Sequence, residues 1–98
     1  MLHIINKSPL ASSTLESCLR MTASGDILLT EDAVYAATKG NAFESKLRAA
    51  MGRCKVYALQ PDLEARGLAD RLIEGVTAVD HGGFVDLTIS NSACQSWL

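Results

Sequence analysis

Cys18, Cys54 and Cys94 are the side chains of this 98-residue chain with the strongest intrinsic chemistry. A thiolate is a nucleophile that can carry sulfur, but a free cysteine is also among the most frequently buried residue types. The number of cysteines is odd and no C-x-x-C motif occurs, so the spacing favours neither a disulfide framework nor a zinc site. Reduced thiols, as in a cytoplasmic protein, fit this pattern better.

Cys18 lies in the stretch STLESCLRM, which predicts the first turns of a helix. Ser13 and Glu16 have the S-x-x-E spacing of a capping box, and Leu15 and Leu19 recur at helical spacing. Cys18 falls at the flank of that apolar stripe, about 60° from Leu15. In the structural interpretation, Cys18 is a small apolar side chain that packs in the core. The functional alternative is a reactive thiol whose pKa the nearby helix N-terminus lowers modestly.

Polar residues follow each expected strand at its carboxyl end. We expect strands at residues 2–5, 27–29, 55–59 and 76–79, with an edge strand at 93–98. In an open parallel sheet, ligands bind beyond the carboxyl ends of the strands. The candidate binding or catalytic residues there are Asn6, Lys7, Ser8, Glu31, Asp32, Gln60, Asp62, Asp80 and His81.

Each of these candidates also has a structural interpretation. Asp32 suits a helix N-cap, and Glu31 with Lys7 suits a solvated ion pair. His81 suits a loop, and His3 inside the first expected strand is interpreted as a core histidine with satisfied hydrogen bonds. Two histidines without ligand spacing predict no metal site.

The segment KSPLASST contains many hydroxyl groups and leads into the first expected helix. Helix N-termini favour anions, so this segment offers a second hypothesis, a phosphate, flavin or other small-anion site near Ser8, Ser12 and Ser13. The segment has no glycine, which weakens the comparison with known phosphate loops.

Helical patterns alternate with the expected strands. They cover residues 13–24, 33–40, 41–51, 60–67 and 80–91. Gly25 is expected to end the first helix and Asn41 to cap the third, while β-branched residues weaken the last one. Continuously apolar strands separated by helices predict one α/β domain over residues 1–98. We expect three layers: a mainly parallel sheet of four to five strands with helices on both faces.

Charge and hydropathy exclude several classes of partner. The formal net charge is −2, from nine basic and eleven acidic residues, so no basic stripe for nucleic acid or a membrane surface is expected. No apolar run approaches the ~20 residues of a membrane span, and the first residues lack a cationic leader. We therefore expect a cytoplasmic protein, and its small core suggests further burial against a partner subunit.

Several segments together resemble the DsrH/TusB family over nearly the whole chain: LHIINKSPLASSTLESCL, GDILLTEDAVYAA, KVYALQPDLEARGL, VDHGGFVDLT and the tryptophan near the end. The resemblance implies a heterohexamer with DsrE/TusD-like and DsrF/TusC-like subunits, without a cofactor. It also implies a relay that passes persulfide sulfur between cysteines to a TusE/DsrC-like acceptor. In the Tus branch the sulfur becomes the 2-thio group of the tRNA wobble uridine; in the Dsr branch it enters sulfur oxidation.

One segment departs from the sulfur-accepting subunits of this superfamily. Those subunits resemble ALQPDLEARG but carry their persulfide cysteine where this chain has Leu59 and Gln60; Arg66 and Gly67 are kept. The resemblance therefore implies an accessory or non-catalytic subunit. Cys18 matches a cysteine of the DsrH branch, which makes it the candidate for a secondary sulfur carrier.

A carrier role for Cys18 has structural requirements. The thiol must be partly exposed or lie beside an opening, and we expect it on the carboxyl side of the sheet. Trp97 is expected to be largely buried, at the core's edge or against a partner. The alternative hypothesis remains an independent anion- or cofactor-binding domain.

Overall fold

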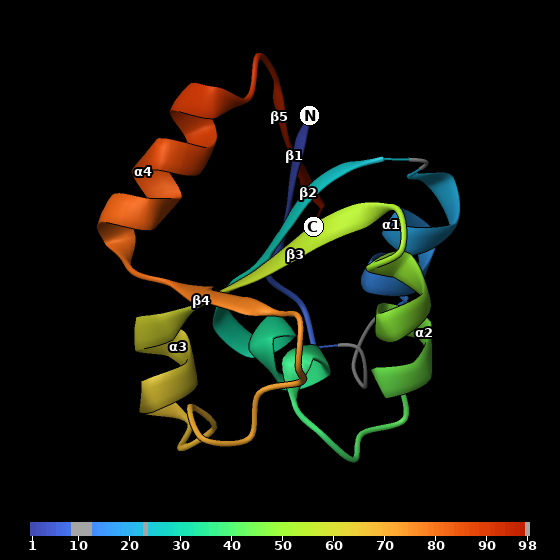
Figure 1. The fold of residues 1–98 in the computed structure, drawn as a ribbon, viewed down its shortest axis with the longest axis vertical. Helices are drawn as coiled ribbons and strands as arrows, with labels where there is room; N and C mark the ends of the chain where they lie inside the picture. The colour runs from blue at the N-terminus through green and yellow to red at the C-terminus, as the bar shows by residue number, and fades with distance from the viewer. Residues whose placement is uncertain (9–12, 23, 98) are drawn as a thin grey trace.

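The computed structural model describes residues 1–8, 13–22 and 24–97, which form a five-stranded sheet (Figure 1). Ser12 and Leu98 lie outside the described residues. The strand order is β4-β3-β2-β1-β5, and every neighbouring pair is parallel. The strands are β1 (Leu2–Ile5), β2 (Gly25–Leu29), β3 (Cys54–Leu59), β4 (Thr77–Val79) and β5 (Cys94–Trp97).

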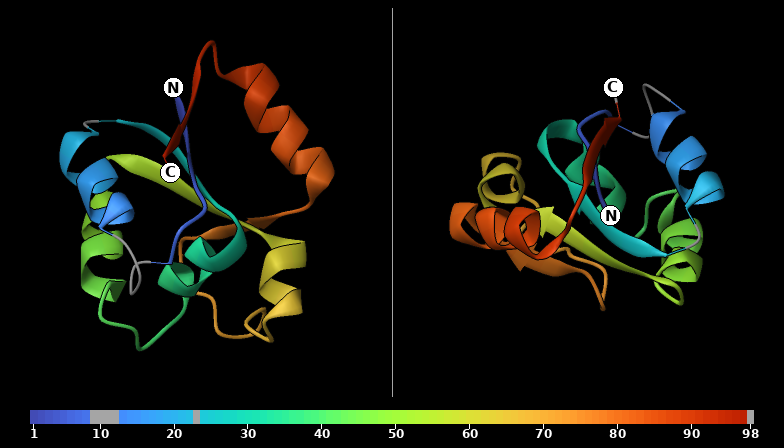
Figure 2. Two further views of the ribbon diagram at one scale, coloured as in Figure 1. Left: turned by 180° about the vertical axis from the view of Figure 1, so that it is seen from behind. Right: turned by 90° about the horizontal axis from the view of Figure 1, so that it is seen from above.

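Helices connect successive strands, as parallel pairing requires. They are α1 (Thr14–Met21), the 3-10 helix η1 (Glu31–Ala37), α2 (Glu44–Ala50), α3 (Gln60–Ala65) and α4 (His81–Ser90). The chain steps from β1 to β4 across the sheet, and α4 then returns it to the opposite edge, where β5 pairs with β1. Figure 1 and the two views of Figure 2 show α4 on one side of the sheet and α1 with α2 on the other.

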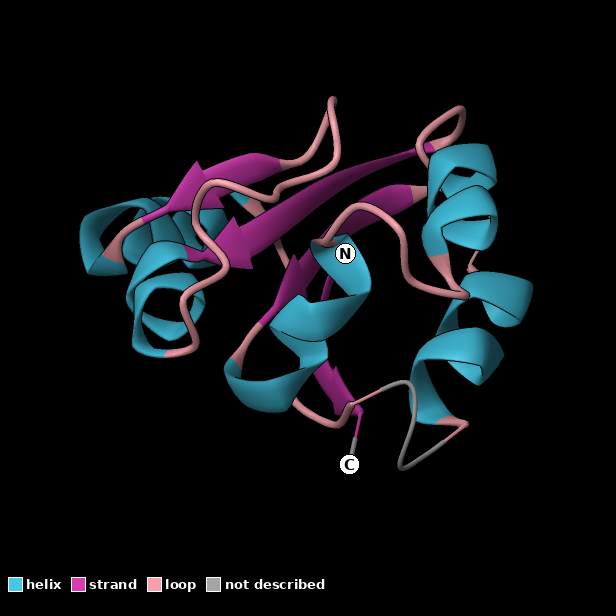
Figure 3. Ribbon diagram, turned by 90° about the horizontal axis from the view of Figure 1, so that it is seen from below, coloured by secondary structure: helices cyan, strands magenta, loops and turns pink. Residues whose placement is uncertain are grey.

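Alternating residues of the strands build two cores of unequal size. In β1, Ile5 belongs to the larger core, beneath α1, η1 and α2, whereas Leu2 belongs to the smaller core beneath α4. The smaller core contains Leu2, Leu28 and Leu87, with Ile4, Tyr57, Val79 and Phe84 packed against it. The prediction of a parallel α/β sheet with helices on both faces is confirmed, as Figure 3 shows.

The first helix begins where predicted but ends earlier than expected. Ser13 is the N-cap of α1, although its side chain makes no capping bond, and Glu16 forms an ion pair of 2.9 Å with Lys46 of α2 instead of the predicted capping box. Helix α1 ends at Met21, and Gly25 instead opens β2. Gly25 has φ +127°, and a Cβ there would lie 2.7 Å from the carbonyl oxygen of Met1, so the close approach of β1 requires glycine.

The segment at Asn41 also differs from the prediction. Helix α2 begins at Glu44, and the Asn41 side chain organises the turn before it. Its Oδ1 accepts the Phe43 N–H at 2.6 Å and its Nδ2 donates to the Ala36 carbonyl at 3.1 Å. The side chain therefore caps a turn that joins η1 to α2, which competes with its role as a helix cap.

The last predicted helix is confirmed as α4. Asp80 is its N-cap, and the carboxylate accepts the Gly83 N–H at 2.8 Å. Packing of Leu87 against the sheet outweighs the weak helix propensity of the β-branched residues. Within the described ranges, every helix is too short or too polar to cross a membrane.

Candidate functional site

Cys18 is completely buried in the larger core, with 0% of its side chain exposed. Its Sγ lies 3.6 Å from Thr22 Oγ1 within α1. Burial raises the pKa of the Cys18 thiol, and the hydrogen bond with Thr22 opposes this rise. The expectations of partial exposure and of a modestly lowered pKa are therefore wrong. Cys18 lies three residues after Leu15 and one before Leu19, inside the buried stripe rather than at its flank.

Cys18 also lies nearer to the amino ends of the strands than expected. The crossover from β1 returns along α1 toward the start of β2, so successive turns of this helix move away from the carboxyl edge. Cys18 interacts electrostatically with Cys54, the first residue of β3. The thiol is thus directed toward the amino ends of the strands, which corrects the expectation that it lies on the carboxyl side.

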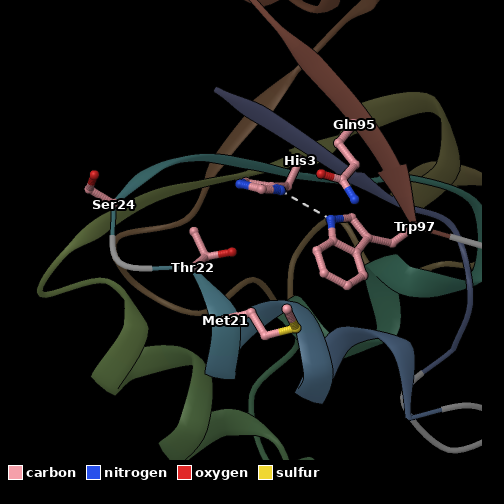
Figure 4. A pocket seen from close by; sticks show the side chains of 6 residues that line it. All are labelled: His3, Met21, Thr22, Ser24, Gln95 and Trp97. Carbon is pink, nitrogen blue, oxygen red and sulfur yellow. Dashed lines mark hydrogen bonds between the residues drawn. The ribbon is translucent and has the colours of Figure 1, made fainter.

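An opening lies next to Thr22, the neighbour of Cys18, but Cys18 itself does not line it. A cavity of about 330 Å³, here called the His3–Trp97 cavity, lies between the end of α1 and the β1–β5 edge (Figure 4). Thr22 lines the cavity and also contacts Cys18, so a single side chain joins the two. The six lining residues are His3, Met21, Thr22, Ser24, Gln95 and Trp97.

One wall of this cavity consists of the side chains of His3 and Trp97, which are joined by a hydrogen bond. Trp97 Nε1–H donates to His3 Nδ1 at 3.0 Å, and the ring centroids lie 6.0 Å apart. Because Nδ1 accepts this bond, the neutral His3 ring carries its proton on Nε2. Burial lowers the pKa of His3, and the positive amino terminus lowers it further. His3 is thus a core histidine, as predicted, and Trp97 is partly buried at the core's edge.

The other two cysteines have different surroundings. Cys54 is almost completely buried. It lines a second cavity of about 330 Å³, whose lining also includes Asp26, Arg53 and Lys55. Burial raises the pKa of the Cys54 thiol, and the positive charge of Arg53 opposes this. Cys94 is exposed at the start of β5 and pairs with Leu2. No pattern in the sequence distinguishes the buried Cys18 and Cys54 from the exposed Cys94.

Ion pairs brace the carboxyl edge of the sheet. Asp62 Oδ2 accepts the Glu31 N–H at 2.7 Å. Two Arg66 nitrogens donate to Asp32 Oδ1 at 2.9 and 3.1 Å, and a third donates to the Asp62 carbonyl. Asp32 therefore lies within η1 as a partner of Arg66, and the prediction that it is an N-cap is wrong. In the sequence, the spacing of four residues between Asp62 and Arg66 is the signal that could have indicated this pair on one helix.

Other candidates at this edge show no common site. Gln60 is exposed at the start of α3, and no ion pair joins Lys7 to Glu31 among the described residues. His81 is exposed at the first position of α4, next to the capping residue Asp80. The Asn6 Oδ1 atom is buried and has no hydrogen-bond partner in the described part of the chain.

Part of the hydroxyl-rich segment KSPLASST lies outside the described residues. Ser8 and Ser13 are described, and Ser13 precedes α1 without a side-chain capping bond. Ser12 is not among the described residues, so the small-anion hypothesis stays a prediction. No group of three or more His, Cys, Asp or Glu side chains suited to a metal ion occurs in the described ranges.

Comparisons with known proteins give consistent results. The sequence model of the family described as "DsrH like protein" matches residues 7–94. The proteins named TusB from Escherichia coli O81 (strain ED1a) and Shigella flexneri are 40% and 39% identical to this chain over 98 residues. These alignments cover 99% of this chain and 100% of each relative.

Two solved structures share the fold. The ychN protein from E. coli has a TM-score of 0.80 at 21% identity, with 98% of this chain and 97% of that chain covered. The protein of unknown function MTH1491 from Methanobacterium thermoautotrophicum has a TM-score of 0.75 at 19% identity, with coverages of 97% and 95%. At these identities the likeness concerns the fold alone.

Proposed function

The chain belongs to the DsrH family, and on this premise we propose that it is an accessory subunit of a cytoplasmic sulfur-relay complex. Its partners in this proposal are a DsrE/TusD-like and a DsrF/TusC-like subunit, two copies of each in a heterohexamer. The complex passes persulfide sulfur between cysteines and delivers it to a TusE/DsrC-like acceptor.

The carboxyl edge supports an accessory role. At the end of β3, where the sulfur-accepting subunits resemble this chain but have a cysteine, Leu59 is buried and Gln60 is exposed. The surrounding Asp32, Asp62 and Arg66 pair with one another, and none of them is a sulfur nucleophile. Alone, the chain is therefore expected to have little or no sulfurtransferase activity.

The end-to-end similarity to proteins named TusB is the observation that carries the choice of branch. An identity of 40% over 98 residues favours the tRNA branch, in which the sulfur becomes the 2-thio group of the wobble uridine. The net charge of −2 fits a subunit that does not itself bind the tRNA.

Cys18 is the residue that we propose as a secondary sulfur carrier in this subunit. Cys94 is exposed but stands at the start of an edge strand, and Cys54 is a buried residue of the larger core at the start of β3. Cys18 is buried, so its participation requires the neighbouring cavity rather than direct exposure.

Complementation tests the proposed function. The chain replaces TusB in an E. coli strain that lacks it, and 2-thiouridine in digested tRNA is quantified by mass spectrometry. We expect the modification to return, and the chain to purify together with the TusC and TusD subunits. A strain without 2-thiouridine, together with a chain that elutes as a monomer in the presence of both subunits, would contradict the proposal.

A further inference from the structure

We propose that the groove between α1 and α2 is a docking surface for an acidic protein segment. The segment places one apolar side chain in the groove and pairs its carboxylates with arginines at the rim. This surface has no role in the proposed function, so its partner is a further property of the chain.

The groove lies where α1 and α2 run side by side on one face of the sheet, as Figures 1 and 2 show. It encloses about 280 Å³. The lining residues are Glu16, Leu19 and Arg20 of α1, Lys46 and Ala49 of α2, and Arg53 of the turn after α2. Four of these six residues are exposed, so the groove opens to solvent.

The apolar part of the groove suits a single anchoring side chain. Leu19 and Ala49 supply it, one from each helix. Leu19 is 6% exposed and belongs to the larger core, so it lies at the bottom of the groove. A volume of about 280 Å³ falls just below the range of small-molecule sites. It fits one large apolar side chain, which is how an amphipathic helix anchors in a groove between helices.

The charges at the rim are not balanced. Glu16 is the only carboxylate among the described lining residues, and Lys46 pairs with it at 2.9 Å. The hydrogen bond and charge of Lys46 lower the pKa of Glu16, and the charge of Arg20 lowers it further. Arg53 donates to carbonyl oxygens at the end of α1, which carry no net charge. Within the described ranges neither arginine forms an ion pair, so two guanidinium charges have no carboxylate partner.

The charge of the whole chain is divided between this face and the rest. Residues 13–22 and 44–55, which contain α1, α2 and the following turn, have five basic and two acidic residues, a net charge of +3. The remaining residues include four basic and nine acidic ones, a net charge of −5. A long polyanion such as RNA would extend onto this acidic remainder, whereas a short acidic segment meets only the positive face. Charge complementarity therefore favours a protein segment.

The chemistry of the rim specifies the segment further. A guanidinium group holds a carboxylate through two parallel hydrogen bonds, so Arg20 and Arg53 suit Asp or Glu side chains. The segment that fits is an amphipathic helix in which a large apolar residue is flanked by carboxylates.

Fluorescence anisotropy of the full chain tests this docking surface. The probe is a fluorescein-labelled helical peptide with leucine and glutamate on one face, and a second peptide has glutamine in place of every glutamate. Arg20→Glu changes an exposed residue that forms no ion pair in the described ranges, which limits its effect on folding. We expect this variant to bind the glutamate peptide at least about tenfold more weakly, because repulsion replaces attraction. The glutamine peptide is expected to bind the parent at least about tenfold more weakly as well.

Glu16→Gln gives an expected change of opposite sign. It removes the carboxylate of the groove and frees the Lys46 ammonium group, so the glutamate peptide is expected to bind about two- to fivefold more tightly. This gain cannot come from misfolding.

Arg71→Glu is the matched control, because Arg71 is exposed, lies outside the groove and undergoes the same change of charge. It is expected to bind the peptide within about twofold of the parent, and circular dichroism confirms that all variants are folded. Failure of the parent to bind the glutamate peptide, or an equal loss in Arg20→Glu and Arg71→Glu, would overturn the inference. Tighter binding of a labelled RNA oligonucleotide than of the peptide, abolished by Arg20→Glu, would overturn it in favour of a nucleic-acid surface.

Discussion

At the scale of single residues, His3 and Cys18 show how burial changes the chemistry of a side chain. The pKa of His3 is lowered because burial and the positive amino terminus disfavour the imidazolium, and the pKa of the Cys18 thiol is raised because burial disfavours the thiolate. Both surroundings include residues that are distant in the sequence, since Trp97 of β5 lies beside His3 and Cys54 of β3 acts on Cys18.

The His3 environment predicts a specific dependence of stability on pH. Its pKa in the folded protein lies below the ordinary value of 6.5, so the unfolded chain binds the proton more readily. The free energy of unfolding is therefore at its full value above pH 6.5 and decreases as the pH falls from there toward the folded-state pKa. Urea unfolding at a series of pH values measures this slope.

His3→Asn is the control for this prediction, because the amide oxygen can accept the Trp97 N–H but does not titrate. We expect a smaller slope between pH 6.5 and acidic pH in this variant. An unchanged slope would mean that another group causes the pH dependence.

Removing the Cys18 sulfur tests its contribution to the core, separately from any carrier role. Cys18→Ala leaves a small void beside Leu15 and Leu19 and is expected to lower the free energy of unfolding by about 1–2 kcal/mol. Cys94→Ala changes an exposed residue and is expected to stay within about 0.5 kcal/mol of the parent. Urea unfolding of both variants checks this, and an equal loss in the two would contradict the burial of Cys18.

At the scale of secondary-structure elements, one side chain holds the end of α1 in place. Arg53 donates to the carbonyl oxygen of Thr22 at 3.0 Å and to that of Leu19. These carbonyls belong to the last turn of the helix, where no backbone donor of the helix can reach them. Arg53 thus fixes the segment that forms one wall of the His3–Trp97 cavity.

Arg53→Ala is therefore expected to lower the free energy of unfolding by about 1–3 kcal/mol, because two carbonyl groups lose a charged donor. The control is Arg48→Ala, which removes an arginine whose ion pair with Glu44 is exposed and is expected to change stability by about 0.5 kcal/mol or less. Thermal unfolding of the two variants provides the comparison. Similar melting temperatures would contradict a role for Arg53 as a helix C-terminal clamp.

Strand β5 is the second element whose removal has a defined consequence. Deleting residues 95–98 removes most of β5, including the Trp97 indole that packs on the core and bonds to His3. We expect a loss of at least about 2 kcal/mol in the free energy of unfolding, or weakened assembly with partner subunits. Ser96→Ala is the control and is expected to behave like the parent in denaturant unfolding and size-exclusion chromatography, whereas a deletion variant with parental stability and assembly would refute this role of β5.

At the scale of the whole molecule, the two faces of the sheet are covered unequally. Helices α1, α2 and α3 with η1 cover one face, whereas α4 alone covers the other, and its Val85 and Ile89 are largely exposed. A domain of this size has a small core, so association with partner subunits would add to its stability.

Binding to the folded state raises the apparent stability by mass action. At a free partner concentration of a hundred times the dissociation constant, the gain is about 2.7 kcal/mol. For a domain of this size that corresponds to a rise of about 10–20 °C in melting temperature. Differential scanning calorimetry of the chain with and without the TusC and TusD subunits measures the shift, and albumin at equal concentration is the control. A melting temperature that both subunits leave unchanged would argue against the proposed complex.

The sequence by itself determined the class of fold and the order of its elements. Apolar runs such as residues 27–29 are buried on both faces of a parallel sheet, and their continuity is visible without any structure. The same holds for α4, whose capping residue Asp80 stands directly before it. Both features depend on residues that are neighbours in the chain.

Only the tertiary structure decided where the candidate site lies. The His3–Trp97 cavity joins residues 94 positions apart, and it exists because β5 returns to pair with β1 rather than with β4. Sequence reasoning placed Cys18 at the flank of its helix and directed it to the wrong edge, since helical spacing specifies a direction around one helix but not the surface that packs against it. Local patterns follow from backbone geometry and hydrophobic periodicity, whereas burial and cavities depend on contacts between distant segments, which no local pattern contains.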